Sequence, residues 1–390
     1  MLKRNEALKR LRTAVSLFFF IHGIVFSAWA NRIPDVKRAL NLSDSALGTV
    51  LFSIPIGQMC AMGLSAWLVN KYGSRKMLVT ASVLYPLFLV PLGFSDNVFA
   101  LSIGLFFFGM SSNLYNIASN TQGVNVEDLY SRSILASFHG VWSLGAFLGG
   151  FVSMGLIMMN VKPSLHFILV FVTAIIIMFC VRHQLVKADL KPHVATDESR
   201  AEEKLPFYKK LDKFLLLLGG MVFFAMICEG CMYDWSGVYF MQVVEAPSEL
   251  VQLGFVVCMC TMTIGRFLAD YFVMRFGAKR LICTSGMLIF IGMALSVAMP
   301  DIVFATIGFL LIGFGISATV PVCYSLAGHS EHLKSGTAVA VVTSIGFFGF
   351  LVGPPVIGHL AGIISLHWTF GVMSCFGLAI ALLSLRLKKR

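Results

Sequence analysis

Long apolar runs dominate the pattern of hydrophobic and polar positions along the chain. Runs of about 20 residues recur from end to end, which is the length a helix needs to cross a bilayer. The polar segments between them are mostly as short as Ser95–Asn97, so successive helices must run antiparallel. We predict twelve spans, at approximately residues 12–31, 44–69, 77–94, 98–121, 133–159, 164–182, 212–241, 250–273, 281–299, 302–325, 335–358 and 366–385.

One polar interruption is longer than the others. Residues 183–211 carry nearly all of the consecutive polar sequence, including DESRAEEK at 197–204. We expect this segment to be a cytoplasmic linker between two six-helix bundles, formed by residues 1–182 and 212–390. The predicted fold class is therefore an all-α integral membrane protein with twelve transmembrane helices.

The composition excludes several other classes of protein. Of the 390 residues 57% are apolar and only 13% are charged, whereas soluble proteins carry about 25% charged residues. This argues against soluble domains and against intrinsic disorder. All nine cysteines fall within predicted spans, so no disulfide framework is implied, and neither a P-loop nor a nucleophile–base constellation is present. We expect no cofactor, no metal site and no enzymatic activity.

The basic residues are distributed unevenly between the two sides of the predicted bundle. The net charge is +11, and 25 of the 30 Lys and Arg residues lie in the N-terminus, the C-terminus and the loops after even-numbered spans. Basic residues near membrane helices mark the cytoplasmic side. We therefore expect both termini and the linker to be cytoplasmic in a bacterial inner membrane. The basic charge then meets anionic membrane lipid, and no nucleic-acid partner is expected.

The second half of the chain repeats the first at an offset of 204–206 residues. Six spans separate the two copies, so both have the same orientation, as in transporters built from parallel repeats. The repeat also uses the first span, so we expect that span to be retained although it begins like a secretory signal. The matched pairs are Trp29 with Trp235, Leu47-Gly48 with Leu253-Gly254, Tyr72-Gly73 with Phe276-Gly277, Ile103-Gly104 with Ile307-Gly308, and Gly145-x-x-x-Gly149 with Gly349-x-x-x-Gly353.

Several short stretches carry a resemblance to a known family. They are Trp29-x-x-Arg32-Ile33-Pro34, Asn120-x-Gln122-Gly123, Phe138-His139-Gly140, Glu229-Gly230 through Asp234-Trp235-Ser236, Gly265-Arg266 through Asp270 to Arg275-x-Gly277, and Gly349-Phe350 through Gly353-Pro354-Pro355-x-Ile357-Gly358. On these residues the chain resembles the major facilitator superfamily, and more closely its bacterial fucose-permease-like branch. The resemblance implies alternating access to a cavity lined mainly by helices 1, 4, 7 and 10.

The chain departs from that family in two places. The signature loop between helices 2 and 3 usually has an acid where this chain has Asn70, although Lys71, Gly73 and Arg75 fit. Proton-coupled fucose permeases use acidic residues in helices 1 and 4, and this chain has none in either span. Neither fucose as the substrate nor the coupling scheme of those permeases is therefore carried over.

Ionisable residues inside the predicted spans are few. Each is a candidate for function because an unpaired charge is costly in a bilayer. Glu229 lies near the middle of the seventh span, one position past the repeat-mate of His22. Desolvation disfavours the charged carboxylate, which suits reversible proton binding, so we assign Glu229 to proton coupling. In the structural alternative, the Glu229 carboxyl group only hydrogen-bonds this helix to a neighbouring helix.

Asp234 follows Glu229 by five residues, about 140° further around a helix. The two acids share a face only if the helix is broken between them. Asp234 is placed to pair with Arg32, either as an outer gate or as a structural tie. Trp29 and Trp235 lie at matching positions and are candidates for stacking on a sugar face, with interfacial anchoring as the alternative.

The fourth span carries a narrow polar stripe. Asn113, Asn116 and Asn120 fall within an arc of about 60°, and amide groups both donate and accept hydrogen bonds, which suits a hydroxyl-rich solute. Interhelical hydrogen bonding is the alternative. His22 and His139 are further candidates for solute contact or proton relay, or else are satisfied core histidines. No Cys or carboxylate lies near them at metal-ligand spacing.

Arg266 and Asp270 lie four residues apart near the cytoplasmic end of the eighth span. Such residues share one helix face. We expect them to pair with each other and to form a gate that releases as the halves move.

Together these features predict a secondary active transporter that moves a small polar solute, with sugars as one candidate class. We expect a monomer that uses proton symport. The open alternatives are an efflux antiporter, a transporter-like solute sensor, and a membrane-embedded enzyme, for which no catalytic set is present.

Overall fold

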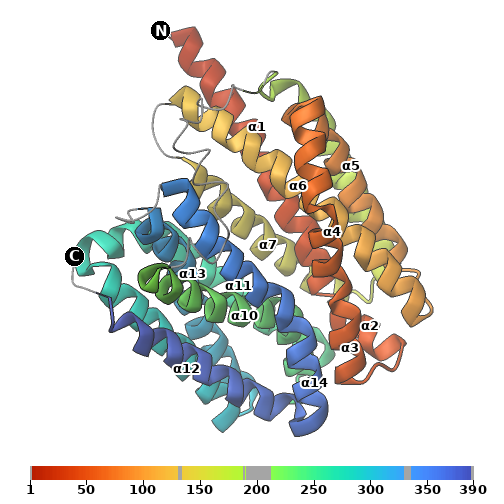
Figure 1. Ribbon diagram of the computed structural model, residues 1–390. Coiled ribbons are helices and arrows are strands. Elements are labelled where there is room, and N and C mark those ends of the chain that lie inside the picture. Colours follow the sequence, from red (N-terminus) through yellow and green to blue (C-terminus); the bar gives the residue numbers. More distant parts are fainter. Residues whose placement is uncertain (1, 131–133, 188, 190–211, 329–334, 388–390) are drawn as a thin grey trace. The chain divides into compact units, whose positions relative to one another are not determined.

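The computed structural model describes residues 2–130, 134–187, 189, 212–328 and 335–387 (Figure 1). Within these ranges the secondary structure is helical and contains no β-strand. The chain forms two compact units, Met1–Leu190 with Pro247–Gln252 and Lys191–Ala246 with Leu253–Arg390. The domain limits at 182 and 212 stay predictions, and most of the expected linker lies outside the described residues.

The N-terminal unit contains the first six of the expected spans. The second span consists of two helices that meet at Phe52, and its first helix is capped by the Ser43 hydroxyl, which accepts from Ala46 N at 3.2 Å. The helices are α1 (Leu2–Ala30), α2 (Ile33–Ala39), α3 (Asp44–Leu51), α4 (Ser53–Tyr72), α5 (Ser74–Leu92), α6 (Val98–Tyr130), α7 (Leu135–Met158) and α8 (Pro163–Val181), with short 3-10 turns η1 (Arg182–Gln184) and η3 (Ser248–Leu250).

Glycines set the closest helix contacts in the N-terminal unit. In this unit α1 packs along α7, and α6 packs against both α4 and α5. A Cβ atom built on Gly145 of α7 would lie 2.3 Å from the carbonyl oxygen of Phe20 in α1, and one on Gly149 would lie 2.3 Å from Ser27 Oγ. The Gly-x-x-x-Gly stretch of α7 therefore allows α1 and α7 to approach each other closely.

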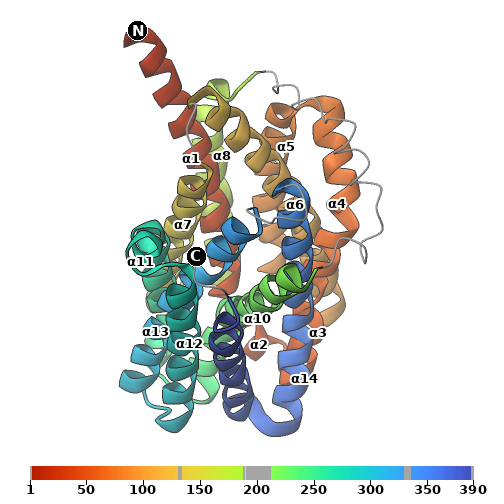
Figure 2. The same ribbon diagram turned by 60° about the vertical axis from the view of Figure 1, so that its left-hand side comes forward.

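The C-terminal unit contains the remaining six spans in five described helices. The last of these has 50 residues, about 75 Å of helix, which is more than twice the hydrocarbon thickness of a bilayer. It bends at Ser365 into two arms that run back along each other (Figure 2). With the two arms counted separately, the described residues form twelve spans. The helices are α10 (Lys213–Gln242), α11 (Leu253–Phe276), α12 (Ala278–Ala298), α13 (Ile302–Gly328) and α14 (Ser335–Ser384).

The C-terminal unit repeats the packing of the N-terminal unit. Here α10 packs along the first arm of α14, and α13 packs against both α11 and α12. A Cβ atom on Gly349 would lie 2.5 Å from the carbonyl oxygen of Phe223, the counterpart of the contact between Gly145 and Phe20. The predicted duplication of a six-helix bundle is confirmed.

Each unit is closed by the same kind of tie between its third and its last span. Arg75 at the start of α5 donates from Nη2 to the carbonyl of Arg182 at 3.4 Å. Lys279 at the start of α12 donates from Nζ to the carbonyls of Leu385 at 2.5 Å and Leu387 at 2.8 Å. Cations suit the free carbonyls at a helix C-terminus. The last span of each half is therefore fastened back to that half.

The residues that follow α8 are fastened to the N-terminal unit. The Asp189 carboxylate accepts from the backbone amide of Ser74 at 2.7 Å, from the Ser74 hydroxyl and from Asn125 Nδ2 at 2.8 Å. Gln122 exchanges two hydrogen bonds with the backbone of Val186, at 2.9 and 3.1 Å. A carboxylate at the start of α5 is favourable because it faces the positive end of the helix dipole.

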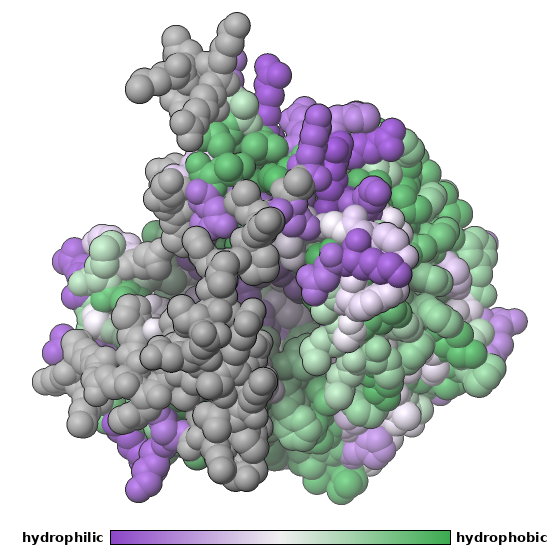
Figure 3. All heavy atoms as spheres, turned by 45° about the horizontal axis from the view of Figure 1, so that its top comes forward, coloured by the Kyte–Doolittle hydropathy of each residue, from purple (hydrophilic) through white to green (hydrophobic). Residues whose placement is uncertain are grey.

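Polar and apolar side chains are segregated on the surface. Hydrophilic side chains gather at the end of the N-terminal unit that carries the α4–α5 turn, and apolar side chains cover its flank (Figure 3). Many large apolar side chains on the helices are exposed, for example Met62, Phe99 and Phe179. An exposed apolar belt is what a bilayer requires.

Candidate functional site

The C-terminal unit holds an ion pair inside its membrane-spanning helices. Glu229 of α10 is 6% exposed, and its Oε1 accepts a hydrogen bond from Arg266 Nη2 of α11 at 2.8 Å. The hydroxyl of Tyr233, one helical turn further along α10, donates to the same oxygen. The three side chains therefore form a buried charged cluster, which we call the Glu229 cluster.

The Glu229 cluster places an acid in the membrane without leaving its charge unpaired. Burial of either charge alone is costly, and the cost is offset only by a close partner and further hydrogen bonds. Tyr233 supplies such a hydrogen bond from its own helix. The contact between Glu229 and Arg266 links α10 to α11.

The described partner of Arg266 differs from the one expected from local spacing. The sequence favours pairing with Asp270 on the same helix, whereas Arg266 reaches across to Glu229. The side chain of Asp270 lies outside the described residues, so its role in a gate stays a prediction.

Asp234 occupies a different face of α10. The helix runs unbroken from Lys213 to Gln242, so Asp234 and Glu229 do not converge. The half-buried Asp234 side chain forms no hydrogen bond or ion pair with any described residue. The expected pairing with Arg32 joins the two units and stays a prediction.

Arg32 is the centre of a buried network in the N-terminal unit. It is 3% exposed, and its Nη1 lies 2.6 Å from Asp35 Oδ2. Nη2 donates to the carbonyl of Val161 at 2.6 Å, and Nε donates to His166 Nδ1 at 3.2 Å. All three nitrogens are therefore engaged within one unit, where they join the end of α1 to the start of α8.

His22 is the buried histidine of α1. Its Nε2 lies 3.4 Å from the hydroxyl of Ser112 in α6, and its ring stacks on Tyr115 at a centroid distance of 4.6 Å. Edge contacts to Tyr85 at 5.1 Å and Trp142 at 6.2 Å complete an aromatic enclosure. We call these five residues the His22 cluster. It contains no carboxylate.

His139 of α7 is exposed, unlike His22. Its ring meets the edge of Phe19 at a centroid distance of 5.4 Å. His22 is enclosed by its neighbours, whereas solute contact by His139 stays a prediction.

The asparagine stripe of α6 is not used to join helices. Asn120 donates from Nδ2 to the backbone carbonyl of Asn116 at 2.9 Å and to its side-chain oxygen at 2.6 Å. Asn113 is half-buried, and its Oδ1 has no hydrogen-bond partner among the described residues. None of the three asparagine side chains forms a hydrogen bond with another described helix. An unsatisfied amide oxygen next to an exposed amide suits a polar ligand.

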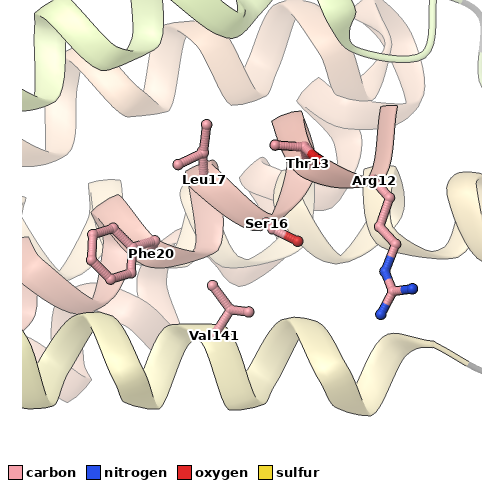
Figure 4. A pocket seen from close by; sticks show the side chains of 6 residues that line it. All are labelled: Arg12, Thr13, Ser16, Leu17, Phe20 and Val141. Atoms are coloured by element: carbon pink, nitrogen blue, oxygen red, sulfur yellow. The ribbon is translucent and has the colours of Figure 1, made fainter. Parts of the chain in front are cut away.

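A small cavity of about 280 Å³ lies against α1 and α7 (Figure 4). Its wall combines one guanidinium and two hydroxyls with apolar side chains, and its volume is near the lower limit for small-molecule pockets. The lining residues are Arg12, Thr13, Ser16, Leu17, Phe20 and Val141.

The two repeat-related tryptophans are both buried. Trp29 is 1% exposed and Trp235 is 0% exposed, and neither indole N–H has a hydrogen-bond partner among the described residues. Anchoring at the lipid headgroups requires an exposed ring, so this alternative is wrong for both. Their proposed stacking on a solute stays a prediction.

Among the described residues, no group of three His, Cys, Asp or Glu side chains lies close enough together to hold a metal ion.

The structure also reveals partners that the sequence analysis missed. Tyr233 is detectable from its spacing of four residues after Glu229. Ser112 and His166 are not, because each meets its partner from another helix.

Two repeated bundles of six membrane-spanning helices, with polar side chains held inside them, define a multi-pass membrane protein. The sequence profile of the Major Facilitator Superfamily matches residues 15–332 and 247–390. The chain belongs to this superfamily. Since the superfamily consists of transporters, the chain is not an enzyme.

Two curated relatives match nearly the whole chain. An uncharacterized MFS-type transporter of Yersinia pestis is 29% identical over 95% of this chain and 94% of its own length. Membrane protein MosC of Rhizobium meliloti is 30% identical over 93% of this chain and 86% of its own length. Among solved structures, a D-xylose-proton symporter aligns with a TM-score of 0.73 over 96% of this chain and 98% of that chain, at 17% identity, which shows a shared fold.

Proposed function

We propose that this protein moves a small polar, sugar-like solute across the bacterial inner membrane by proton-coupled symport. Both termini are cytoplasmic in this proposal, as the distribution of basic residues favours. The functional unit is a monomer, because one chain carries both halves of the repeat. The motif residues favour the fucose-permease-like branch, with a solute other than fucose.

The Glu229 cluster is the observation that carries the proposal. While Glu229 is ionised, its carboxylate holds Arg266 and keeps α10 tied to α11. A proton that binds Glu229 removes the negative charge and weakens this tie. Arg266 is then available to donate hydrogen bonds to solute oxygens. Release of the proton on the other side of the membrane restores the ion pair and favours solute release.

The N-terminal unit supplies most of the solute contacts in this proposal. The free amide oxygen of Asn113, the exposed amide of Asn116 and the exposed ring of His139 offer hydrogen bonds to hydroxyl groups. Asn120, His22 and Trp29 of this unit, with Trp235 of the C-terminal unit, complete the candidate set. Arg32, Asp234, Arg266 and Asp270 control access as the two units alternate.

Transport by purified protein in proteoliposomes tests the proposal. Uptake is measured over a panel of sugars, sugar acids and polyols, with and without an imposed inward proton gradient. Wild type should accumulate one solute class only with the gradient. Glu229→Gln should lose accumulation by at least tenfold but keep solute exchange without a gradient, because exchange needs no net proton movement.

Glu249→Gln is the matched control, since it makes the same change at an exposed residue of η3. It should behave like wild type. Gradient-driven accumulation by Glu229→Gln at the wild-type level would remove Glu229 from coupling. Solute export driven by an inward gradient would identify an antiporter instead.

A further inference from the structure

Two turns at the ends of membrane spans share a pattern that the transport mechanism does not use. One joins α4 to α5 and the other joins α11 to α12. Six positions match between them at a single spacing of 204 residues and have the same exposure class in both turns. The pairs are Trp67 with Tyr271, Lys71 with Arg275, Tyr72 with Phe276, Gly73 with Gly277, Arg75 with Lys279, and Lys76 with Arg280.

The first turn holds a cation between two exposed aromatic rings. Lys71 Nζ lies 4.5 Å from the ring centre of Trp67 and 5.3 Å from that of Tyr72. The rings are 50% and 45% exposed. The contacts hold the ammonium group at the ring faces and leave it accessible to solvent or lipid.

The second turn repeats the arrangement with different residues. Arg275 Nη1 donates to the Tyr271 hydroxyl at 2.9 Å, and the guanidinium carbon lies 5.8 Å from the ring centre of Phe276. These rings are 49% and 47% exposed. A cation flanked by the rings four residues before it and one residue after it is thus built twice in one chain.

Neither turn neutralises its own charge. Lys71, Lys76, Arg275 and Arg280 are exposed, and none forms an ion pair with a described residue. The carboxylate of Asp189 lies at the first turn but is engaged by Ser74 and Asn125. Both turns therefore present positive charge that lacks a described protein counterion.

We propose that these two turns are matched binding sites for the headgroups of anionic phospholipids. Exposed Trp and Tyr side chains at the ends of membrane spans lie at headgroup depth. Basic side chains beside them attract the phosphate of an anionic lipid. The aromatic rings contact the glycerol and upper acyl region while Lys71 or Arg275 meets the phosphate.

A soluble polyanion is the competing occupant. A polyanion would account for the positive charge of the turns, but it does not explain why two large aromatic rings are half exposed at each turn. The lipid accounts for both the charge and the rings. The proposal does not depend on which solute the protein carries or on proton coupling.

Native mass spectrometry of the full-length protein in detergent micelles tests this proposal by counting bound phosphatidylglycerol. Wild type should hold two phosphatidylglycerol molecules more tightly than further ones, and should hold phosphatidylethanolamine more weakly. Lys71→Gln and Arg275→Gln should each weaken one of the two by about fivefold, and the double variant both. Lys71→Arg should bind like wild type.

Lys162→Gln is the matched control, because Lys162 is exposed between α7 and α8 without flanking aromatic rings. It should keep both lipids. Wild-type binding by the double variant, or equal binding of phosphatidylethanolamine, would overturn the proposal. So would inorganic polyphosphate that displaces the lipid with the same dependence on Lys71 and Arg275. Thermal unfolding of each variant verifies that it is folded.

Discussion

The two halves of this transporter share a scaffold but differ in the chemistry at their centres. In the N-terminal half, His22 is enclosed by aromatic rings and a serine hydroxyl. In the C-terminal half, the position one residue past the repeat-mate of His22 is Glu229, which is paired with Arg266. At this matching position, one half holds a histidine among aromatic rings and a hydroxyl group, and the other holds a charge pair.

The two halves have kept the same backbone contacts between helices, whereas the side chains at their centres differ. Close backbone contacts recur in both halves, as at Gly145 and Gly349, because a side chain there meets a carbonyl oxygen. The central side chains face no such restriction. We therefore expect changes at scaffold positions to act equally in the two halves, and changes at the centres to act on different steps of transport.

The largest effect should come from breaking the charge pair of the C-terminal half. Glu229→Gln and Arg266→Gln should each destabilise the protein by about 3 kcal/mol, because each leaves a buried polar group without its partner. The double variant should be less destabilised than the sum of the two, as measured by unfolding in a double-mutant cycle. Simple additivity would mean that the pair is not coupled.

The scaffold contacts should give the next largest effect, and the same effect in both halves. Gly145→Ala and Gly349→Ala each force a backbone shift and should cost about 1–3 kcal/mol of unfolding free energy. Gly155→Ala is the control, because no atom lies within 4 Å of its added Cβ. A large difference in unfolding free energy between Gly145→Ala and Gly349→Ala would show that the scaffolds of the two halves are not equivalent.

The centre of the N-terminal half should control solute affinity. Asn113→Leu should raise the transport KM about tenfold while stability and gradient dependence stay unchanged, because its amide oxygen has no described protein partner. Tyr115→Phe should affect stability instead of solute affinity. It removes the hydrogen bond to the Phe18 carbonyl at 2.8 Å and should cost about 1 kcal/mol of stability without changing KM.

The smallest effects should come from the ties that close each half. Arg75→Gln should loosen the end of α8, and Lys279→Gln the end of α14. Amide hydrogen exchange at those helix ends should accelerate by about two- to fivefold, which corresponds to a helix-end interaction of 0.3–1 kcal/mol. Acceleration in the opposite half would show that the ties do not act locally.

The sequence was sufficient to predict the number of spans and the duplication, because span length and helix contacts leave periodic apolar and glycine patterns. It predicted less of helix length, since α6 continues to Tyr130 through polar residues after the expected end at 121. The partner of Arg266 was missed for a physical reason. Spacing along one helix reveals Asp270, whereas the contact with Glu229 arises only when α10 packs against α11.

The ties at Arg75 and Lys279 also bear on how the chain can be divided. Each half fastens its last helix to its own third helix, so the tie that closes each set of six helices lies within that half. Two separate polypeptides, cut between residues 190 and 211 and made in the same cell, should therefore each insert and then reassemble into a working carrier.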